Sequence, residues 1–338
     1  MSRIFSRRFS TCLRVLLPVM LAGCAGQHIA FPAPPATELA SVPFYPQDQY
    51  QCGPAALATV LDWSGTDVNM ASLVSSVYVP GRQGSLQPEM IAAARRAGRI
   101  PYTLPPQPAA LSAELAAGNP VLVLQNLGLN SLPRWHYAVV VGYDPGDDVF
   151  ILRSGVEKSR RESVQRFMSS WQRAGYWGLV VLQPGQVPAS RVVAEPVALA
   201  LANAEALLSP GAAVRAWEGL MVRWPDDADV LFGTANALRR KGDDSAAGNT
   251  YLALLQRHPD HIAARNNFAD LLLQAGCAEQ ARTVMRGIQE DTLAPPLSLA
   301  VSDTRRKINE DMRRPRGDGS AVSCKRWRSG SIVPLRPE

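Results

Sequence analysis

The sequence has few residues of the kinds that bind metals, and no loop of the kind that binds nucleotides. Four histidines and five cysteines are spread over 338 residues, and no group of them has the spacing of metal ligands. The chain also lacks the G-x-x-x-x-G-K-[ST] pattern, whose backbone cradles phosphates. We therefore expect no metal and no other cofactor.

Positive charge is scarce in the middle of the chain, although the total net charge is +6. Residues 1–14 carry four arginines and no acid, and residues 303–338 carry ten basic and five acidic residues. The rest has 21 basic and 24 acidic residues, a net charge of −3. A folded body near neutrality has no electrostatic footprint for a phosphate backbone, so we expect no nucleic-acid partner.

Long apolar runs are absent after the N-terminal leader, since none approaches the roughly 20 residues that span a bilayer. A basic N-terminus is followed by the short run VLLPVMLAG and Cys24, which predicts a secretory signal over residues 1–23. The ending LAGC resembles a bacterial lipobox. This resemblance implies a lipidated Cys24 as the mature N-terminus, on the periplasmic side of the outer membrane. An ordinary signal peptide cleaved nearby is the alternative.

Composition and periodicity divide the remaining chain. Residues 24–40 are rich in Pro and Ala and predict an extended linker. Residues 41–186 predict an α+β domain, a helical lobe followed by an antiparallel sheet. Its expected helices are CGPAALATVLDWSG and SLQPEMIAAARRAG, the second capped by Ser85, and its expected strands are NPVLVLQN, HYAVVVGYD, VFILRSG and YWGLVVL. Residues 300–338 show no periodicity and predict a basic, disordered tail.

Residues 192–292 contain an internal repeat. The stretches RWPDDADVLFGTANALRRKGDDSAA and RHPDHIAARNNFADLLLQAGCAEQA align without gaps at an offset of 34 residues. They share a Pro, a Gly between the expected helices, and alanines that let paired helices approach closely. The period and these residues resemble tetratricopeptide repeats, which implies an all-α repeat domain that binds a protein partner. A generic bundle of α-hairpins is the alternative.

The chemistry of the α+β domain centres on Cys52, which stands at the expected N-terminus of the first helix. The helix macrodipole is expected to lower the pKa of this thiol, and the thiolate is the nucleophile. His136 is the one histidine of this domain, and a cysteine at a helix N-terminus facing a histidine on a strand is the papain-like arrangement. The side-chain amide of Gln47 and the backbone N–H of Cys52 would together form an oxyanion hole. Trp135 and Tyr137 flank the histidine, either as cleft walls or as core residues.

The stretches VPFYPQDQYQCGPAALATVL and HYAVVVGYD resemble the bacteriocin-processing peptidase family, papain-like cysteine peptidases that cut after double-glycine leaders. The resemblance covers about residues 41–184. It implies Cys52 as the nucleophile, His136 as the base and Gln47 as the oxyanion donor. Family members that process bacteriocins are often fused to an exporter, whereas this chain shows neither long apolar runs after its leader nor a phosphate-binding loop.

One position departs from the family pattern. Family members usually carry an Asp at the end of the strand that follows the histidine strand, and here the sequence reads ILRSG. Arg153, Ser154 and Glu157 are the candidates for that position, and Ser154 is the favoured one because its hydroxyl can orient an imidazole. The loss of an orienting acid weakens catalysis without abolishing it.

The sequence thus predicts a lipid-anchored cysteine peptidase of the cell envelope, whose helical repeats recruit a peptide or protein substrate or a partner. The first alternative is a catalytically weak or inactive scaffold that binds peptides, which the missing acid favours. The second is amide or thioester chemistry on another acyl group, because the same site serves any acyl transfer. Cys52 could instead form a disulfide bond, with Cys277 or Cys324 as its candidate partner. A bond between Cys277 and Cys324 would leave Cys52 free.

Overall fold

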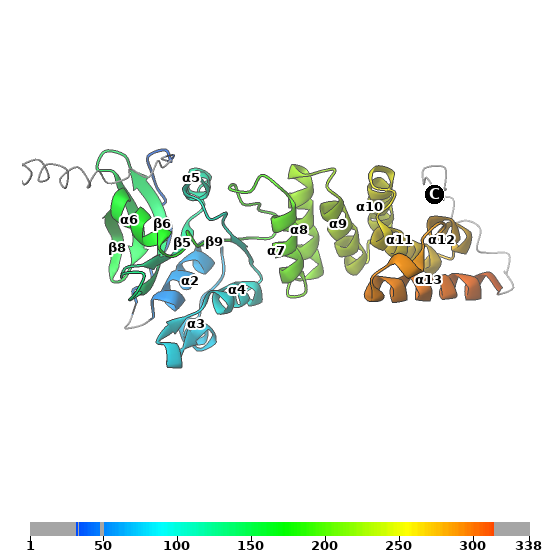
Figure 1. Cartoon of the computed structure of the whole chain (residues 1–338), viewed down its shortest axis with the longest axis horizontal. Helices are drawn as coiled ribbons and strands as arrows, with labels where there is room; N and C mark the ends of the chain where they lie inside the picture. The colour runs from blue at the N-terminus through cyan, green and yellow to red at the C-terminus, as the bar shows by residue number, and fades with distance from the viewer. Residues whose placement is uncertain (1–31, 33, 48–50, 314–338) are drawn as a thin grey trace, which may run out of the picture.

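The structure is a computed structural model, and it describes residues 32, 34–47 and 51–313. The expected signal segment 1–23, the proposed lipidation site Cys24 and residues 314–338 lie outside the described residues. The described chain forms a region built on a β-sheet and a region built of helices, which lie side by side (Figure 1).

An antiparallel sheet of seven strands is the centre of the first region. Its strands are β1 (Thr37–Glu38), β4 (Ile100–Thr103), β5 (Val121–Asn126), β6 (Trp135–Asp144), β7 (Val149–Ser154), β8 (Glu157–Ser163) and β9 (Gly178–Leu182). Six of them follow the order β4-β9-β5-β6-β7-β8, and β1 pairs with the end of β6. Side chains alternate along β6, so that Tyr137 and Val139 join one hydrophobic core and Ala138 and Val140 join another. The sheet therefore carries a core on each face.

Helices cover both faces of the sheet (Figure 1). One core contains residues of the helical lobe, which consists of α2 (Cys52–Trp63), α3 (Met70–Val77) and α4 (Gln87–Arg96). The other core contains residues of α5 (Pro108–Ala116) and α6 (Val164–Gln172). Between α3 and α4 the chain makes a small hairpin of β2 (Tyr78–Val79) and β3 (Gly84–Ser85), joined by the 3-10 turn η2 (Pro80–Arg82).

Helix α2 is the central helix of the lobe, and its sequence explains its place. Nine of its 12 residues are buried, because small and aliphatic side chains lie on all sides of it. Pro54 lies in the first turn, where its missing N–H costs no hydrogen bond. A Cβ atom on Gly53 would lie 2.5 Å from the side chain of Ser85, so the glycine lets β3 approach the start of the helix. The N-terminus of α2 is thus held between the sheet and the β2–β3 hairpin.

The strands expected from the sequence are confirmed as β5, β6, β7 and β9. Two expectations need correction. Ser85 belongs to β3 and does not cap α4, which begins at Gln87 with Leu86 as its N-cap. The linker expected over residues 24–40 includes β1, because Thr37 and Glu38 pair with Tyr143 and Gly142 at the end of β6.

The second region consists of helices joined by short turns. They are α7 (Glu195–Glu205), α8 (Pro210–Arg223), α9 (Ala228–Lys241), α10 (Asp244–Arg257), α11 (Ile262–Gln274), α12 (Ala278–Val284) and α13 (Pro295–Arg313). The hairpins α9–α10 and α11–α12 begin 34 residues apart, at Ala228 and Ile262. Gly242 and Gly276 end the first helix of each hairpin with φ of +88° and +75°, which an L side chain rarely adopts. The 34-residue offset in the sequence therefore corresponds to two successive helical hairpins.

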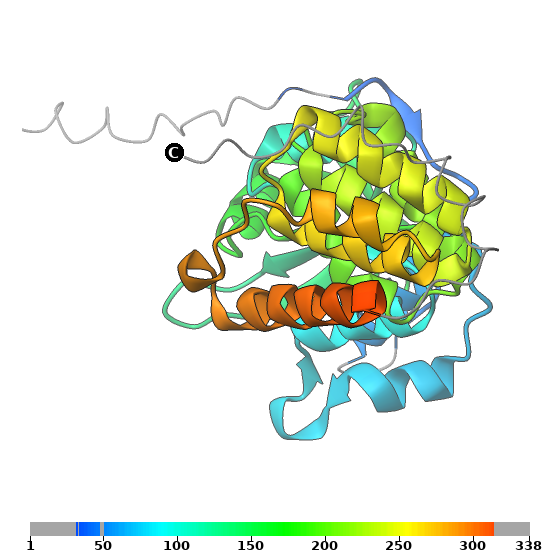
Figure 2. The ribbon, with the colours of Figure 1, turned by 90° about the vertical axis from the view of Figure 1, so that its right-hand side faces the viewer.

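The expected tail over residues 300–338 is wrong in its first part. Residues up to Arg313 belong to α13, which packs against α11 and α12 and is drawn in orange to red in Figure 2. Val301, Thr304 and Ile308 are buried on this helix at spacings of three and four residues. These three side chains form a narrow stripe within a strongly charged helix, so composition alone did not reveal it.

The two regions share a continuous hydrophobic core, in which α7 packs against β4. Polar contacts fix the connection between them. The buried carboxylate of Glu114 on α5 accepts a hydrogen bond from the Ser190 N–H at 2.8 Å, and Arg191 donates to the Thr103 carbonyl at 2.6 Å. Within the described ranges, no helix is both long enough and apolar enough to cross a membrane.

Candidate active site

Cys52 is the first residue of α2 and is a free thiol, whereas Cys277 is disulfide-bonded. Its sulfur accepts hydrogen bonds from the backbone N–H groups of Tyr137, Gly53 and Cys52 itself, and these lower its pKa. Desolvation by burial is the larger effect, and it raises the pKa of the Cys52 thiol above its ordinary value. The expectation of a lowered pKa is therefore wrong, because the loss of water around the sulfur outweighs the helix N-terminus.

His136 is the second residue of β6, and its ring is held by a hydroxyl group. The Nε2 atom of His136 lies 2.8 Å from Oγ of the buried Ser154 at the end of β7. Desolvation lowers the pKa of His136 to about 4, and the positive charge of Arg160 acts in the same direction. The imidazole is thus neutral at pH 7. If the Ser154 hydroxyl accepts from Nε2–H, Nδ1 is left as the proton acceptor.

The thiol contacts the backbone beside the imidazole, at Tyr137, which follows His136 in the chain. Among the described residues, no hydrogen bond joins the side chains of Cys52 and His136 directly. Instead, the N–H of Tyr137 donates to the sulfur. The Tyr137 ring meets the Trp177 ring edge-on at 5.9 Å, and its hydroxyl donates to the Ser85 carbonyl at 3.3 Å. These contacts fix the backbone that separates the two groups.

Gln47 lies beside the same thiol. Gln47, Cys52 and Ser154 line one small cavity, together with Tyr45, Ala55, Ala56, Thr59, Tyr137, Arg153 and Gly155. The Gln47 N–H donates to the Gly155 carbonyl at 3.1 Å. Gly155 follows Ser154 directly and has a φ of +65°. A single tight turn after β7 therefore positions both the residue that holds His136 and the segment that carries Gln47.

The other two candidates for the position of the missing acid lie elsewhere. Arg153 is buried and donates to the Val42 carbonyl at 3.2 Å and the Lys158 carbonyl at 2.7 Å. Glu157 is exposed and forms an ion pair with Arg160 at 3.5 Å. Of the three, Ser154 is the one whose side chain bonds to His136.

Cys52 also lies on the wall of a groove of about 1050 Å³. It is lined by the β2–β3 hairpin, the first residues of α4, Leu124 of β5 and the start of β6. The lining residues are Cys52, Gly81, Arg82, Gln83, Gly84, Ser85, Leu86, Gln87, Leu124, Pro133, Arg134, Trp135, Tyr137 and Ala174. The expectation that Trp135 and Tyr137 wall a cleft is confirmed, although Tyr137 is also a core residue.

Sequence reasoning missed the hairpin wall and the role of Arg160. The hairpin had a signal, since GRQG places two glycines three residues apart, as tight turns often do. Arg160 had none, because its effect on His136 depends on how β8 pairs with β7.

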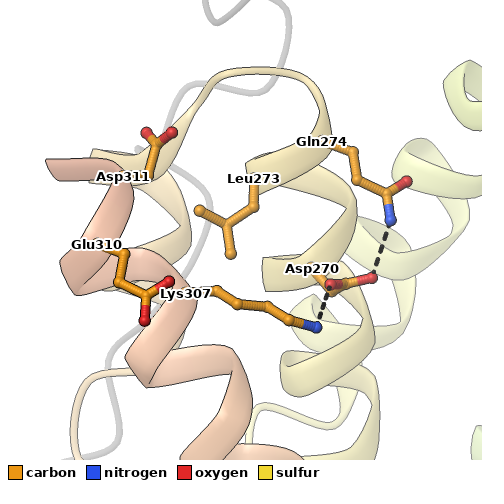
Figure 3. A pocket seen from close by; sticks show the side chains of 6 residues that line it. All are labelled: Asp270, Leu273, Gln274, Lys307, Glu310 and Asp311. Carbon is orange, nitrogen blue, oxygen red and sulfur yellow. Dashed lines mark hydrogen bonds and ion pairs between the residues drawn. The ribbon is translucent and has the colours of Figure 1, made fainter. Parts of the chain in front are cut away.

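The helical region has pockets as well, and the one described here is lined mainly by charged and polar side chains. The one in Figure 3 lies between α11 and α13 and is lined by Asp270, Leu273, Gln274, Lys307, Glu310 and Asp311. Lys307 lies 4.0 Å from Asp270, and Gln274 donates to the same carboxylate at 3.1 Å. The described residues contain no cluster of His, Cys, Asp and Glu suited to a metal ion. Among the described residues, the free thiol of Cys52 therefore lies apart from these pockets, on the groove of the sheet region.

Comparisons with known proteins concern the same part of the chain. Residues 39–178 match the family described as Peptidase_C39 like, which is less than half of the 338-residue chain. No curated protein matches the chain.

Solved structures that match part of the chain include a C39-like protein from Bacillus anthracis, at 16% identity and a TM-score of 0.38, covering 44% of this chain and 98% of that chain. A double-glycine motif protease from an AMS/PCAT transporter, solved in complex with the leader peptide, matches at 22% identity and a TM-score of 0.35. This match covers 42% of this chain and 91% of that chain. The peptidase domain of Streptococcus ComA, a bi-functional ABC transporter, matches at 22% identity and a TM-score of 0.35. This match covers 42% of this chain and 98% of that chain. The family match, which includes Cys52 and His136, makes residues 39–178 similar to the C39-like peptidases.

Proposed function

We propose that this chain is a cysteine peptidase that cleaves peptide bonds in the groove at Cys52. One observation supports this most: a free thiol on the wall of a groove lies against the backbone next to a histidine, and a hydroxyl holds that histidine at 2.8 Å. The family match over residues 39–178 supports the same reaction class.

In the first step, the thiol attacks the carbonyl carbon of the substrate. His136 takes the proton from the sulfur, and the carbonyl oxygen becomes an oxyanion. The backbone N–H of Cys52 and the side-chain amide of Gln47 donate to this oxyanion, each worth on the order of 3 kcal/mol. The C–N bond then breaks, the amine leaves with the proton that His136 returns, and an acyl thioester remains on Cys52.

In the second step, water hydrolyses the thioester. His136 removes a proton from the water as its oxygen attacks the acyl carbon, and the same donors stabilise the second oxyanion. The C–S bond breaks, the sulfur regains its proton from the imidazolium, and the acid product leaves. The site ends as it began, with neutral thiol and neutral imidazole.

The hydroxyl of Ser154, in place of a carboxylate, limits the catalytic rate of this site. A hydroxyl fixes the ring but does not stabilise an imidazolium as a carboxylate would. Because burial already keeps the pKa of His136 at about 4 and that of Cys52 above its ordinary value, the resting site holds no thiolate–imidazolium pair. Proton transfer has to accompany the attack, and we expect slow turnover.

We also propose that the protein is anchored to a membrane and that its helical region binds a partner. A lipid on Cys24 would hold the protein at the periplasmic side of the outer membrane, and the basic leader with its LAGC ending supports this. The hairpins at a 34-residue offset would act as tetratricopeptide-like repeats that recruit a substrate or a protein partner.

The test is cleavage of a proteome-derived peptide mixture by the full-length chain, purified in detergent. New peptide N-termini are identified by mass spectrometry. We expect a set of new termini with the wild type that is absent with Cys52→Ala and reduced with His136→Gln. His258→Gln is the matched control, since this histidine lies on the helical region and bonds to the Asp226 carbonyl. Equal termini from wild type and Cys52→Ala would rule the function out.

A further inference from the structure

The charged side chains that line the groove at Cys52 are all positive. Its lining includes Arg82 and Arg134 and no Asp or Glu. Arg82 ends the turn η2 of the β2–β3 hairpin, and Arg134 immediately precedes β6, so the two arginines come from different segments that line the groove. The carboxylate of Glu89 on α4 influences Tyr137, but it does not line the groove.

The two guanidinium groups are available for a ligand. Both residues are exposed, and among the described residues neither side chain has a hydrogen-bond or ion-pair partner. Other arginines of this region are already paired: Arg153 with Glu38, Arg160 with Glu157, and Arg161 with Asp144 and Asp147.

The backbones that carry the two arginines are fixed. The N–H of Arg134 donates to the Asn126 side chain at 3.0 Å, and its carbonyl accepts from the Leu127 N–H at 2.8 Å. The turn of Arg82 is closed by the Gln83 N–H, which donates to the Pro80 carbonyl at 3.1 Å. The backbone positions of both residues are set before a ligand arrives, so binding does not have to order these backbone segments.

A third positive charge lies near the site. Arg160 acts on His136 from β8, but it is paired with Glu157 and does not line the groove. The charge of the groove itself therefore comes from Arg82 and Arg134. Guanidinium groups bind carboxylates with paired, charge-assisted hydrogen bonds. Leu86, Leu124 and Trp135 add apolar side chains to the same groove.

We propose that Arg82 and Arg134 select peptides that present a carboxylate to the groove beside the bond to be cleaved. This inference rests on the proposed peptidase function and adds the substrate class to it. The carboxylate can come from an Asp or Glu side chain or from the C-terminus of the peptide, and the two sources share the same chemistry.

The test separates binding from cleavage by using the full-length Cys52→Ala chain. Four pools of fluorescein-labelled peptides have equal length and apolar composition. They carry central glutamates or central glutamines, each with a free or an amidated C-terminus. Fluorescence anisotropy at low salt measures the affinity of each pool.

We expect the chain to bind the pools that retain the recognised carboxylate about tenfold more tightly, the size of a charge-assisted hydrogen bond. The preference is expected to fall as salt rises. A difference between the glutamate and glutamine pools assigns the carboxylate to a side chain, and a difference between free and amidated pools assigns it to the C-terminus.

The double variant Arg82→Gln and Arg134→Gln is expected to lose this preference, while affinity for the amidated glutamine pool changes less than about twofold. Arg166→Gln is the matched control, because this exposed arginine lies on α6 and does not line the groove. Equal affinity for all four pools, or an unchanged preference in the double variant, would overturn the proposal. A failure of the peptidase function would show separately, as an absence of new peptide termini with the wild type.

Discussion

Each region of the molecule contains a buried arginine that binds backbone carbonyls, and the two differ in how far they reach along the chain. Arg265 on α11 donates to the carbonyls of Pro259, Val284 and Arg286, all within 21 residues of it. Arg153 on β7 donates to the carbonyl of Val42, 111 residues away. The helical region is thus built from local contacts, whereas the sheet region and its candidate site depend on distant segments meeting.

The two cysteines of these regions give the largest contrast. Cys52→Ala is expected to lower peptide cleavage at least about a thousandfold with little change in stability, because the thiol is the nucleophile. Cys277→Ser is expected to cost about 2–5 kcal/mol of unfolding free energy through loss of its disulfide, while activity per folded molecule stays the same. Thermal unfolding and cleavage rates measured on both variants check this. Similar losses of activity in the two variants would show that the contrast is wrong.

The buried arginines Arg153 and Arg265 allow a second comparison between the two regions. Replacement of either by Met leaves buried carbonyls without donors, and we expect a loss of about 3 kcal/mol for each. Arg153→Met is also expected to lower kcat in the fraction that stays folded, since Arg153 precedes Ser154 and joins β7 to the segment before Gln47. Arg265→Met is expected to leave kcat unchanged. Denaturant unfolding and kinetics below the transition separate the two outcomes, and equal effects on kcat would contradict the account.

The pKa of His136 predicts a pH dependence of stability that belongs to the sheet region. This pKa is about 4 in the folded chain and about 6.5 in an unfolded one, so the unfolded chain binds more protons between these values. The free energy of unfolding should therefore fall as the pH drops from about 6.5 to about 4, by up to ~3 kcal/mol from this group. His136→Gln should remove that part of the decline, and His258→Gln should not. A decline of the same size in both variants would exclude His136 as its source.

Two glycines allow close packing, one in each region. A Cβ on Gly53 would collide with Ser85, and a Cβ on Gly233 would collide with the ring of Trp217. Overpacking of this kind costs about 1–3 kcal/mol, so we expect both alanine variants to unfold at lower denaturant concentration. Gly53→Ala should also slow cleavage, because it displaces the hairpin wall of the groove, and Gly233→Ala should not. An unaffected cleavage rate in Gly53→Ala would mean that the hairpin does not shape the site.

Substitutions of Ser154 are expected to change cleavage the least, and Ser154→Asp is the one variant expected to increase it. Ser154→Asp places a carboxylate beside His136, which should raise the pKa of the imidazole and increase cleavage about tenfold at pH 7. Ser154→Ala should lower cleavage by a similar factor. Ser163→Asp, at the exposed end of β8, controls for added charge. Kinetics over a range of pH would show the shift, and an unchanged profile in both variants would remove Ser154 from the site.

The same difference between local and distant contacts decides what the sequence could predict. The 34-residue offset and the strand runs are local patterns, and they located the hairpins and most of the sheet. The sequence also identified Cys52, His136 and Gln47 as candidates, and the structure brings Cys52 and Gln47 to one cavity and His136 to Ser154.

What the sequence could not predict depends on contacts between distant segments. It favoured Ser154 but did not exclude Arg153 and Glu157, because the places of these residues depend on how β6, β7 and β8 pair. It misjudged the pKa of Cys52, because the burial of the sulfur depends on the sheet and on the β2–β3 hairpin. The groove and its arginines come from segments more than 50 residues apart, Arg82 and Arg134.

The most direct test of the account is the rate at which a peptidyl vinyl sulfone labels Cys52 in the full-length chain, measured against pH for wild type and His136→Gln. We predict labelling that rises through about pH 4, as the imidazole loses its proton, and reaches a plateau near neutral pH. His136→Gln should lower the rate at pH 7 at least about a hundredfold. Equal rates in the two proteins at every pH would show that Cys52 and His136 do not act together, and the peptidase account would then be wrong.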